Sequence, residues 1–88
     1  MTQILHIIGL QGVGKSTLAR QIQVANSSLG IDCKNLTELG LHEPGWDTDL
    51  TPFRLPYRTG VLIVEHVDEP RPSQVQPGDL LIRLERAA

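Results

Sequence analysis

The chain has 88 residues, of which 40% are hydrophobic and 20% are charged, and its formal net charge at pH 7 is −2. This length predicts one small domain over residues 1–88, and the charge lacks the basic excess of a nucleic-acid-binding surface. The single cysteine, Cys33, excludes an internal disulfide and a cysteine-based metal cluster. No apolar stretch is long enough to span a membrane, and no signal peptide precedes the first predicted strand, so we expect a cytoplasmic protein without membrane contacts.

The first predicted element is a buried strand at residues 3–8, whose apolar residues form a nearly continuous run: Ile4, Leu5, Ile7 and Ile8. Such a run is typical of a strand that is covered on both faces, as in parallel sheets. His6 interrupts the run. We interpret it as a packed or edge-facing strand histidine rather than as a catalytic residue.

A glycine-rich segment follows, and it fits the pattern G-x-x-x-x-G-K-[ST] at every fixed position from Gly9 to Ser16. A predicted strand before it and a predicted helix after it supply the context that this pattern needs. Glycines let a loop curl around an anion with its N–H groups inward, and the helix adds its positive end. An accidental glycine loop before a helix is the alternative interpretation.

The pattern assigns a role to each residue of this segment. Lys15, expected to be exposed, would contact the β- and γ-phosphates, and the Ser16 hydroxyl would bind Mg²⁺. We expect an anion against the N–H groups of Gly12, Gly14, Lys15 and Ser16. The predicted nucleotide-binding residues are Gly9, Gln11, Gly12, Val13, Gly14, Lys15, Ser16 and Thr17.

A helix is predicted from Ser16 to Leu29, because apolar residues recur on one face at helical spacing: Leu18, Ile22, Ala25 and Leu29. Gly30 is suited to end this helix, since glycine readily takes the left-handed conformation of a helix terminus. Residues 31–36 predict a short strand, and its charged members favour a position at the edge of the sheet.

Residues 37–60 predict a long irregular segment, in which prolines and glycines leave no room for a helix of useful length. The segment holds every aromatic residue of the chain, Trp46, Phe53 and Tyr57. Loops of this length are usually functional or are ordered by a partner. We expect a second copy or another protein to contact this segment, with core packing of the aromatic residues as the alternative.

The second strong apolar run, residues 60–66, predicts a central strand that ends near Glu65. The carboxyl ends of parallel strands share one edge of a sheet, so Glu65 is expected beside the glycine-rich segment. An acid there can hold a Mg²⁺-bound water or orient an attacking water. A solvated strand-end glutamate is the alternative, and Asp68 and Glu69 rank lower because they follow the strand.

One turn of helix at residues 73–76 and a last strand at residues 79–85 complete the predicted order. Four strands and one main helix predict an α/β fold. We expect a small, three-layer-like arrangement with a mostly parallel sheet, in which the strand at residues 61–64 lies beside or one removed from the first strand.

The chain resembles the P-loop NTPase superfamily over nearly its whole length. Residues 9–16 match the Walker A motif and residues 61–65 resemble the Walker B segment, with Glu65 in place of the usual aspartate. The resemblance implies a minimal member of the P-loop fold that binds a nucleoside triphosphate, expected to be ATP. It implies Mg²⁺ as the cofactor, held by Ser16 and Glu65, and catalytic roles for Lys15 and Glu65.

Two classes of function follow. The first is a small NTPase that hydrolyses nucleotide slowly and needs an arginine opposite the transferred phosphate. Arg54, Arg58 and Arg71 are the candidates, each with a solvated surface position as its alternative. The second is a nucleotide-responsive regulatory module with little or no turnover. A miniature kinase-like phosphotransferase is a third hypothesis, and the sequence does not decide the base.

Overall fold

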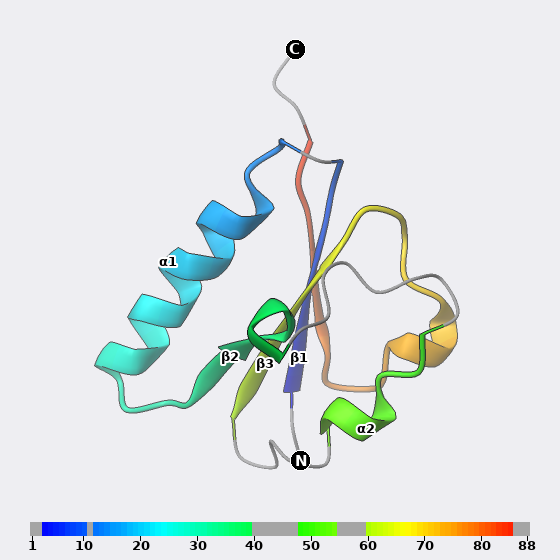
Figure 1. Ribbon diagram of the computed structural model, residues 1–88. Helices are drawn as coiled ribbons and strands as arrows, with labels where there is room; N and C mark the ends of the chain where they lie inside the picture. Colours follow the sequence, from blue (N-terminus) through cyan, green and yellow to red (C-terminus); the bar gives the residue numbers. More distant parts are fainter. Residues whose placement is uncertain (1–2, 11, 40–47, 55–59, 86–88) are drawn as a thin grey trace.

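The chain forms an α/β fold around a four-stranded, all-parallel sheet (Figure 1). The computed structural model describes residues 3–10, 12–39, 48–54 and 60–85. The strand order is β2-β3-β1-β4, and the strands are β1 (Gln3–Ile8), β2 (Cys33–Asn35), β3 (Val61–His66) and β4 (Leu80–Arg83). The predicted fold class is confirmed, including the central pair of strands and the edge position of the short strand β2.

Helices cover both faces of this sheet (Figure 1). The main helix α1 (Lys15–Ser28) lies on one face, and the short helices α2 (Thr51–Arg54) and η2 (Pro72–Gln74) lie on the other. Residues of β1 alternate between the two cores, so that Ile7 packs with Ala19 of α1 while Ile4 packs with Leu50 before α2. None of the helices in the described ranges is long and apolar enough to cross a membrane.

The buried face of α1 differs from the predicted one. Ala19 is completely buried, and Leu18 and Ile22 pack against the same cluster. Ala25 is exposed, however, and Leu29 is 76% exposed. The helix runs obliquely to the strands (Figure 1). The sheet therefore covers only its first turns, and helical spacing by itself does not show where a covered face ends.

Gly30 ends α1 as predicted. Its φ of 76° is left-handed, and its N–H donates to the carbonyl of Ser27 at 3.0 Å. The N–H of Ile31 donates to the carbonyl of Asn26 at 2.9 Å. These two bonds satisfy carbonyls that the end of a helix otherwise leaves without partners.

The structure describes part of the predicted irregular segment, residues 37–39, 48–54 and 60. It contains most of the 3₁₀ helix η1 (Leu36–Leu39) and the single turn of α2. Phe53 is partly buried and packs against the core cluster that contains Leu50, as the core-packing alternative predicted. Trp46 and Tyr57 lie outside the described residues, so their suggested role as anchors for a partner stays a prediction.

A chain of buried polar side chains runs through the core on the α2 side of the sheet. The Nδ1 atom of His6 lies 2.8 Å from Nε2 of His66, and Nε2 of His6 lies 3.0 Å from Oδ2 of Asp79. Arg54 donates to both oxygens of Asp79, at 3.0 and 2.6 Å. Because a carboxylate only accepts, a neutral His6 carries its proton on Nε2 and accepts at Nδ1 from His66. His6 is thus a packed strand histidine, as predicted.

The surroundings of this chain shift its protonation equilibria. Burial, together with the neighbouring His6 and Lys15, lowers the pKa of His66 to about 4. Burial also lowers the pKa of His6, which Asp79 opposes. Burial would raise the pKa of Asp79, but the hydrogen bonds from Arg54, His6 and two backbone N–H groups outweigh it and lower the pKa to about 2. At neutral pH two uncharged histidines therefore adjoin an ionised Asp79–Arg54 pair.

We predict that the free energy of unfolding decreases as the pH falls from about 6.5 to about 4. In this window the unfolded chain binds a proton at His66 that the folded chain excludes, which is worth up to about 3 kcal/mol. Asp79 does not contribute to this change, because a carboxyl with a lowered pKa loses its stabilising effect only below about pH 4. Urea denaturation at several pH values measures the slope.

His66→Gln serves as the comparison, since it keeps a polar side chain that does not titrate. Its unfolding free energy should depend less on pH across the same window, whatever its absolute value. Identical slopes for the two proteins would show that His66 is not the group responsible.

Candidate functional site

The glycine-rich loop (residues 9–14) begins at the carboxyl end of β1. The N–H of Gly9 donates to the carbonyl of His66 at 2.9 Å, and the N–H of Leu84 donates to the carbonyl of Ile8 at 2.8 Å. A side chain at position 9 would not fit, because its Cβ would lie 2.7 Å from Cγ1 of Val13 and 3.0 Å from the carbonyl oxygen of Leu84. The loop is therefore anchored at its start to the last residue of β3 and to the segment that follows β4.

The loop then curls into the first turn of α1. Gly12 and Gly14 have φ values of 80° and 103°, which glycine adopts without strain. The N–H of Val13 donates to the carbonyl of Leu10 at 3.3 Å, and Gly14 directly precedes the helix. No side chain in the part of the chain that the structure describes caps this helix end, and its first turn holds no acidic residue. Such an end attracts an anion. Gln11, a predicted binding residue, lies outside the described residues.

Lys15 differs from its predicted exposure. The side chain is only 5% exposed, and its ammonium donates to the carbonyl of Gly9 at the other end of the loop. Side chains of an α-helix lean toward its N-terminus, which brings the ammonium of this first helical residue back over the loop. The prediction of an exposed lysine was wrong, because the ammonium is held at the carbonyl of Gly9.

The site's acid and hydroxyl are brought together as predicted. The Ser16 hydroxyl donates to Oε1 of Glu65 at 2.9 Å, across 49 positions of sequence. The Asn35 amide donates to Oε2 of Glu65 at 2.8 Å, and the Thr37 N–H donates to Oδ1 of Asn35 at 3.0 Å. Glu65 is buried within β3, so the alternative of a solvated strand-end glutamate is wrong.

Asn35 was missed by the sequence interpretation. It is the last residue of β2 and pairs in register with Ile63, which places its amide beside Glu65. The available signal was a polar residue two positions after Cys33, and therefore on the same face of the strand. It lies at the end where parallel strands present their binding residues.

A polar hollow of about 430 Å³ opens beside this cluster. It lies between α1, β2, η1 and β3, and its lining includes Ser16, Thr17, Asn35 and Glu65. No group of three or more histidine, cysteine, aspartate or glutamate side chains in the described ranges is arranged to hold a metal. The hard oxygens of Ser16 and Glu65 nevertheless fit Mg²⁺, which usually takes one or two protein carboxylates and completes its shell with water and phosphate.

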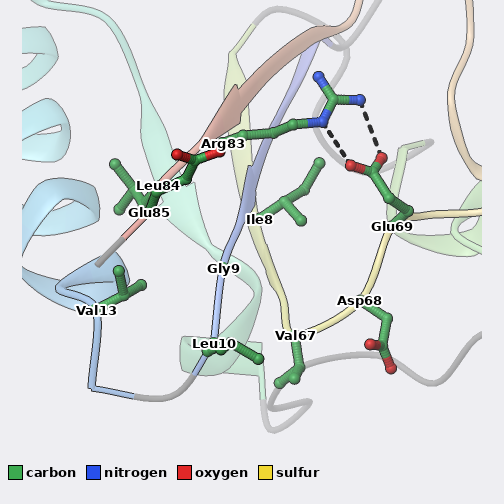
Figure 2. A pocket seen from close by; sticks show the side chains of 10 residues that line it. All are labelled: Ile8, Gly9, Leu10, Val13, Val67, Asp68, Glu69, Arg83, Leu84 and Glu85. Atoms are coloured by element: carbon green, nitrogen blue, oxygen red, sulfur yellow. Dashed lines mark hydrogen bonds and ion pairs between the residues drawn. The ribbon is translucent and has the colours of Figure 1, made fainter. Parts of the chain in front are cut away.

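A second hollow of about 450 Å³ lies on the other side of the loop, between the segments that follow β3 and β4 (Figure 2). Leu10, Val13 and Leu84 contribute apolar walls to it. The ion pair between Arg83 and Glu69, at 3.0 Å for one of its bonds, flanks it. Glu69 is thus occupied away from Ser16, which supports its lower rank as a site residue.

The structure does not bring two of the three candidate arginines to the site. Arg54 holds Asp79 on the α2 side of the sheet, opposite to α1 and Ser16. Arg71 precedes η2 on that same side. Arg58 lies outside the described residues. The candidate role of Arg58 therefore stays a prediction.

We predict that Gly14→Ala and Gly30→Ala lower stability by a similar amount, about 1–2 kcal/mol, because both glycines are left-handed and neither added Cβ meets another atom within 4 Å. Only Gly14→Ala should weaken the binding of tripolyphosphate, measured by calorimetry, because only Gly14 adjoins the anion-attracting helix end. Equal binding by both variants would contradict an anion site at this loop.

Comparison with protein-family models, curated proteins and solved structures found no match to this chain.

Proposed function

We propose that this chain binds a Mg²⁺-nucleoside triphosphate, with ATP as the expected nucleotide, through the glycine-rich loop and the first turn of α1. The observation that carries the proposal is the 2.9 Å hydrogen bond between Ser16 and Glu65. It joins the two parts of the sequence that separately suggested phosphate and Mg²⁺ binding. A glycine loop that precedes a helix by accident gives no reason for a buried acid at this hydroxyl.

The residues of the loop supply complementary charge and hydrogen-bond donors. The N–H groups of Gly12, Gly14, Lys15 and Ser16 are suited to phosphate oxygens, since a helix start and left-handed glycines can direct such groups toward a bound anion. The ammonium of Lys15 would exchange the Gly9 carbonyl for phosphate oxygens. A Mg²⁺ ion held by Ser16 and Glu65 would neutralise phosphate charge. Asn35 would orient the carboxylate of Glu65 for that purpose.

The apolar hollow next to the loop supports a ligand larger than phosphate. Its walls include Leu10 and Val13 of the loop itself, and Leu10 is 70% exposed. A nucleoside that packed there would cover apolar surface close to its own phosphates. A volume near 450 Å³ lies within the usual range of small-molecule sites.

A regulatory module that binds nucleotide with little turnover is the second candidate function. It is favoured by the positions of Arg54 and Arg71 on the opposite side of the sheet, away from the loop. Phosphate release distinguishes the candidates, because steady release after many turnovers requires an enzyme. We further propose a cytoplasmic location and a protein partner or second copy that contacts residues 37–60.

We predict that Mg²⁺-ATP at 100 times its Kd raises the melting temperature of the chain by more than about 10 °C, since this occupancy contributes about 2.7 kcal/mol. Lys15→Ala should abolish the shift without unfolding the chain. Because Lys15 is buried, Lys15→Met provides a second variant that keeps the aliphatic stem. Lys34→Met is the matched control and should retain the shift. An unchanged nucleotide affinity in both Lys15 variants would rule out the proposed function.

We also predict that Glu65→Gln removes the dependence of nucleotide binding on Mg²⁺. The amide keeps the size of the side chain but loses the charge that attracts the cation, so the tightening of ATP binding by Mg²⁺ should fall at least tenfold. Asp68→Asn, an acid exposed just beyond β3, should leave this tightening unchanged. Titrations with a fluorescent ATP analogue, with Mg²⁺ and with EDTA, provide the comparison.

A further inference from the structure

The polar hollow beyond Ser16 contains one cationic side chain, Arg20, that the proposed site has not used. Arg20 lies four residues after Ser16, which is about one turn of helix and about 6 Å along its axis. The two residues therefore share a face of α1, and both line the hollow. Because helical side chains lean toward the N-terminus, we expect the side chain of Arg20 to lean toward Ser16 rather than away from it.

Arg20 has no hydrogen-bond or ion-pair partner in the part of the chain that the structure describes. The two carboxylates in the lining of the hollow hold other donors: Glu38 accepts from Gln23, and Glu65 accepts from Ser16 and Asn35. Arg54 and Arg83, in contrast, are each paired with a carboxylate. The side chain of Arg20 is thus available for an external oxyanion.

The size and charge of the hollow define what it would take. A water molecule occupies about 30 Å³, so a volume near 430 Å³ exceeds what a Mg²⁺ ion and its waters need. A Mg²⁺ ion at Ser16 and Glu65 would place a second positive charge in the same hollow as Arg20. An oxyanion between the two cations stabilises both, and a guanidinium can bind two phosphoryl oxygens at once.

We propose that Arg20 binds the terminal phosphoryl group of the nucleotide in this polar hollow. This inference rests on the proposed function and extends it, because it makes Arg20 the residue that distinguishes a triphosphate from a diphosphate. The positive charge beside the terminal phosphoryl group then comes from Arg20, and neither Arg54 nor a partner's arginine is needed to supply it. A separately bound inorganic phosphate would offer the same oxygens to Arg20, so the experiment separates the two sources.

The test compares ADP with the non-hydrolysable triphosphate analogue AMPPNP, both with Mg²⁺, by calorimetry on the full chain. Arg20→Gln should weaken the binding of AMPPNP at least tenfold and leave the affinity for ADP within about twofold of its original value, because ADP has no terminal phosphoryl group. Arg20→Lys should recover part of the loss. Lys34→Gln is the matched control, since it removes a cation of β2 that lines neither hollow, and its ratio of AMPPNP to ADP affinity should equal that of the unmodified chain.

Three results would overturn the proposal. In the first, the Arg20→Gln variant binds AMPPNP as tightly as the unmodified chain, or its affinities for ADP and for AMPPNP fall by the same factor. In the second, the binding of inorganic phosphate to the ADP complex depends on Arg20, whereas the binding of AMPPNP does not. This result would assign Arg20 to a separate phosphate site. In the third, the unmodified chain binds neither nucleotide, and then the proposed function fails as well. If the unmodified chain binds both nucleotides and Arg20→Gln does not change their affinity ratio, the Arg20 proposal fails but the proposed nucleotide binding stands.

Discussion

The carboxylate of Glu65 is the constraint on which the arrangement of the site depends. It belongs to β3, accepts one hydrogen bond from Ser16 of α1 and another from Asn35 of β2, and is only 5% exposed. A buried carboxylate that loses its donors costs several kcal/mol, so these two bonds hold helix, edge strand and central strand in one relative position. The same geometry leaves the Ser16 hydroxyl and the carboxylate side by side at the edge of a polar hollow.

The two faces of the sheet carry different groups of polar residues, and both groups are connected to the start of the glycine-rich loop. On the α1 side lie the polar hollow and the residues proposed to bind phosphate. On the α2 side, His66 and His6 link the end of β3 to the ion pair of Asp79 and Arg54. The backbone carbonyl of His66 accepts the N–H of Gly9, so the buried polar chain and the loop share one residue. The position of the loop thus depends on packing on both faces.

Local sequence patterns predicted the elements that depend on backbone chemistry. The glycine spacing before Lys15 predicted the loop, Gly30 predicted the end of α1, and two apolar runs predicted the central strands. These features depend on residues that are close in sequence. The predicted exposure of Lys15 was wrong because its ammonium folds back onto the Gly9 carbonyl. The predicted burial of Leu29 was wrong because the sheet covers only the first turns of α1, which helical spacing by itself does not show.

The sequence by itself determined that a glycine loop joins a buried parallel strand to a helix, and that an acid lies near the end of the second strongly apolar strand. Only the tertiary structure decided which side chains meet there. Asn35 reaches Glu65 because β2 pairs with β3, and Arg54 is removed from the site because α2 packs on the opposite face. Contacts between residues distant in sequence are set by how oblique helices and sheet edges pack, because many sequences with the same local patterns can satisfy that packing in different ways.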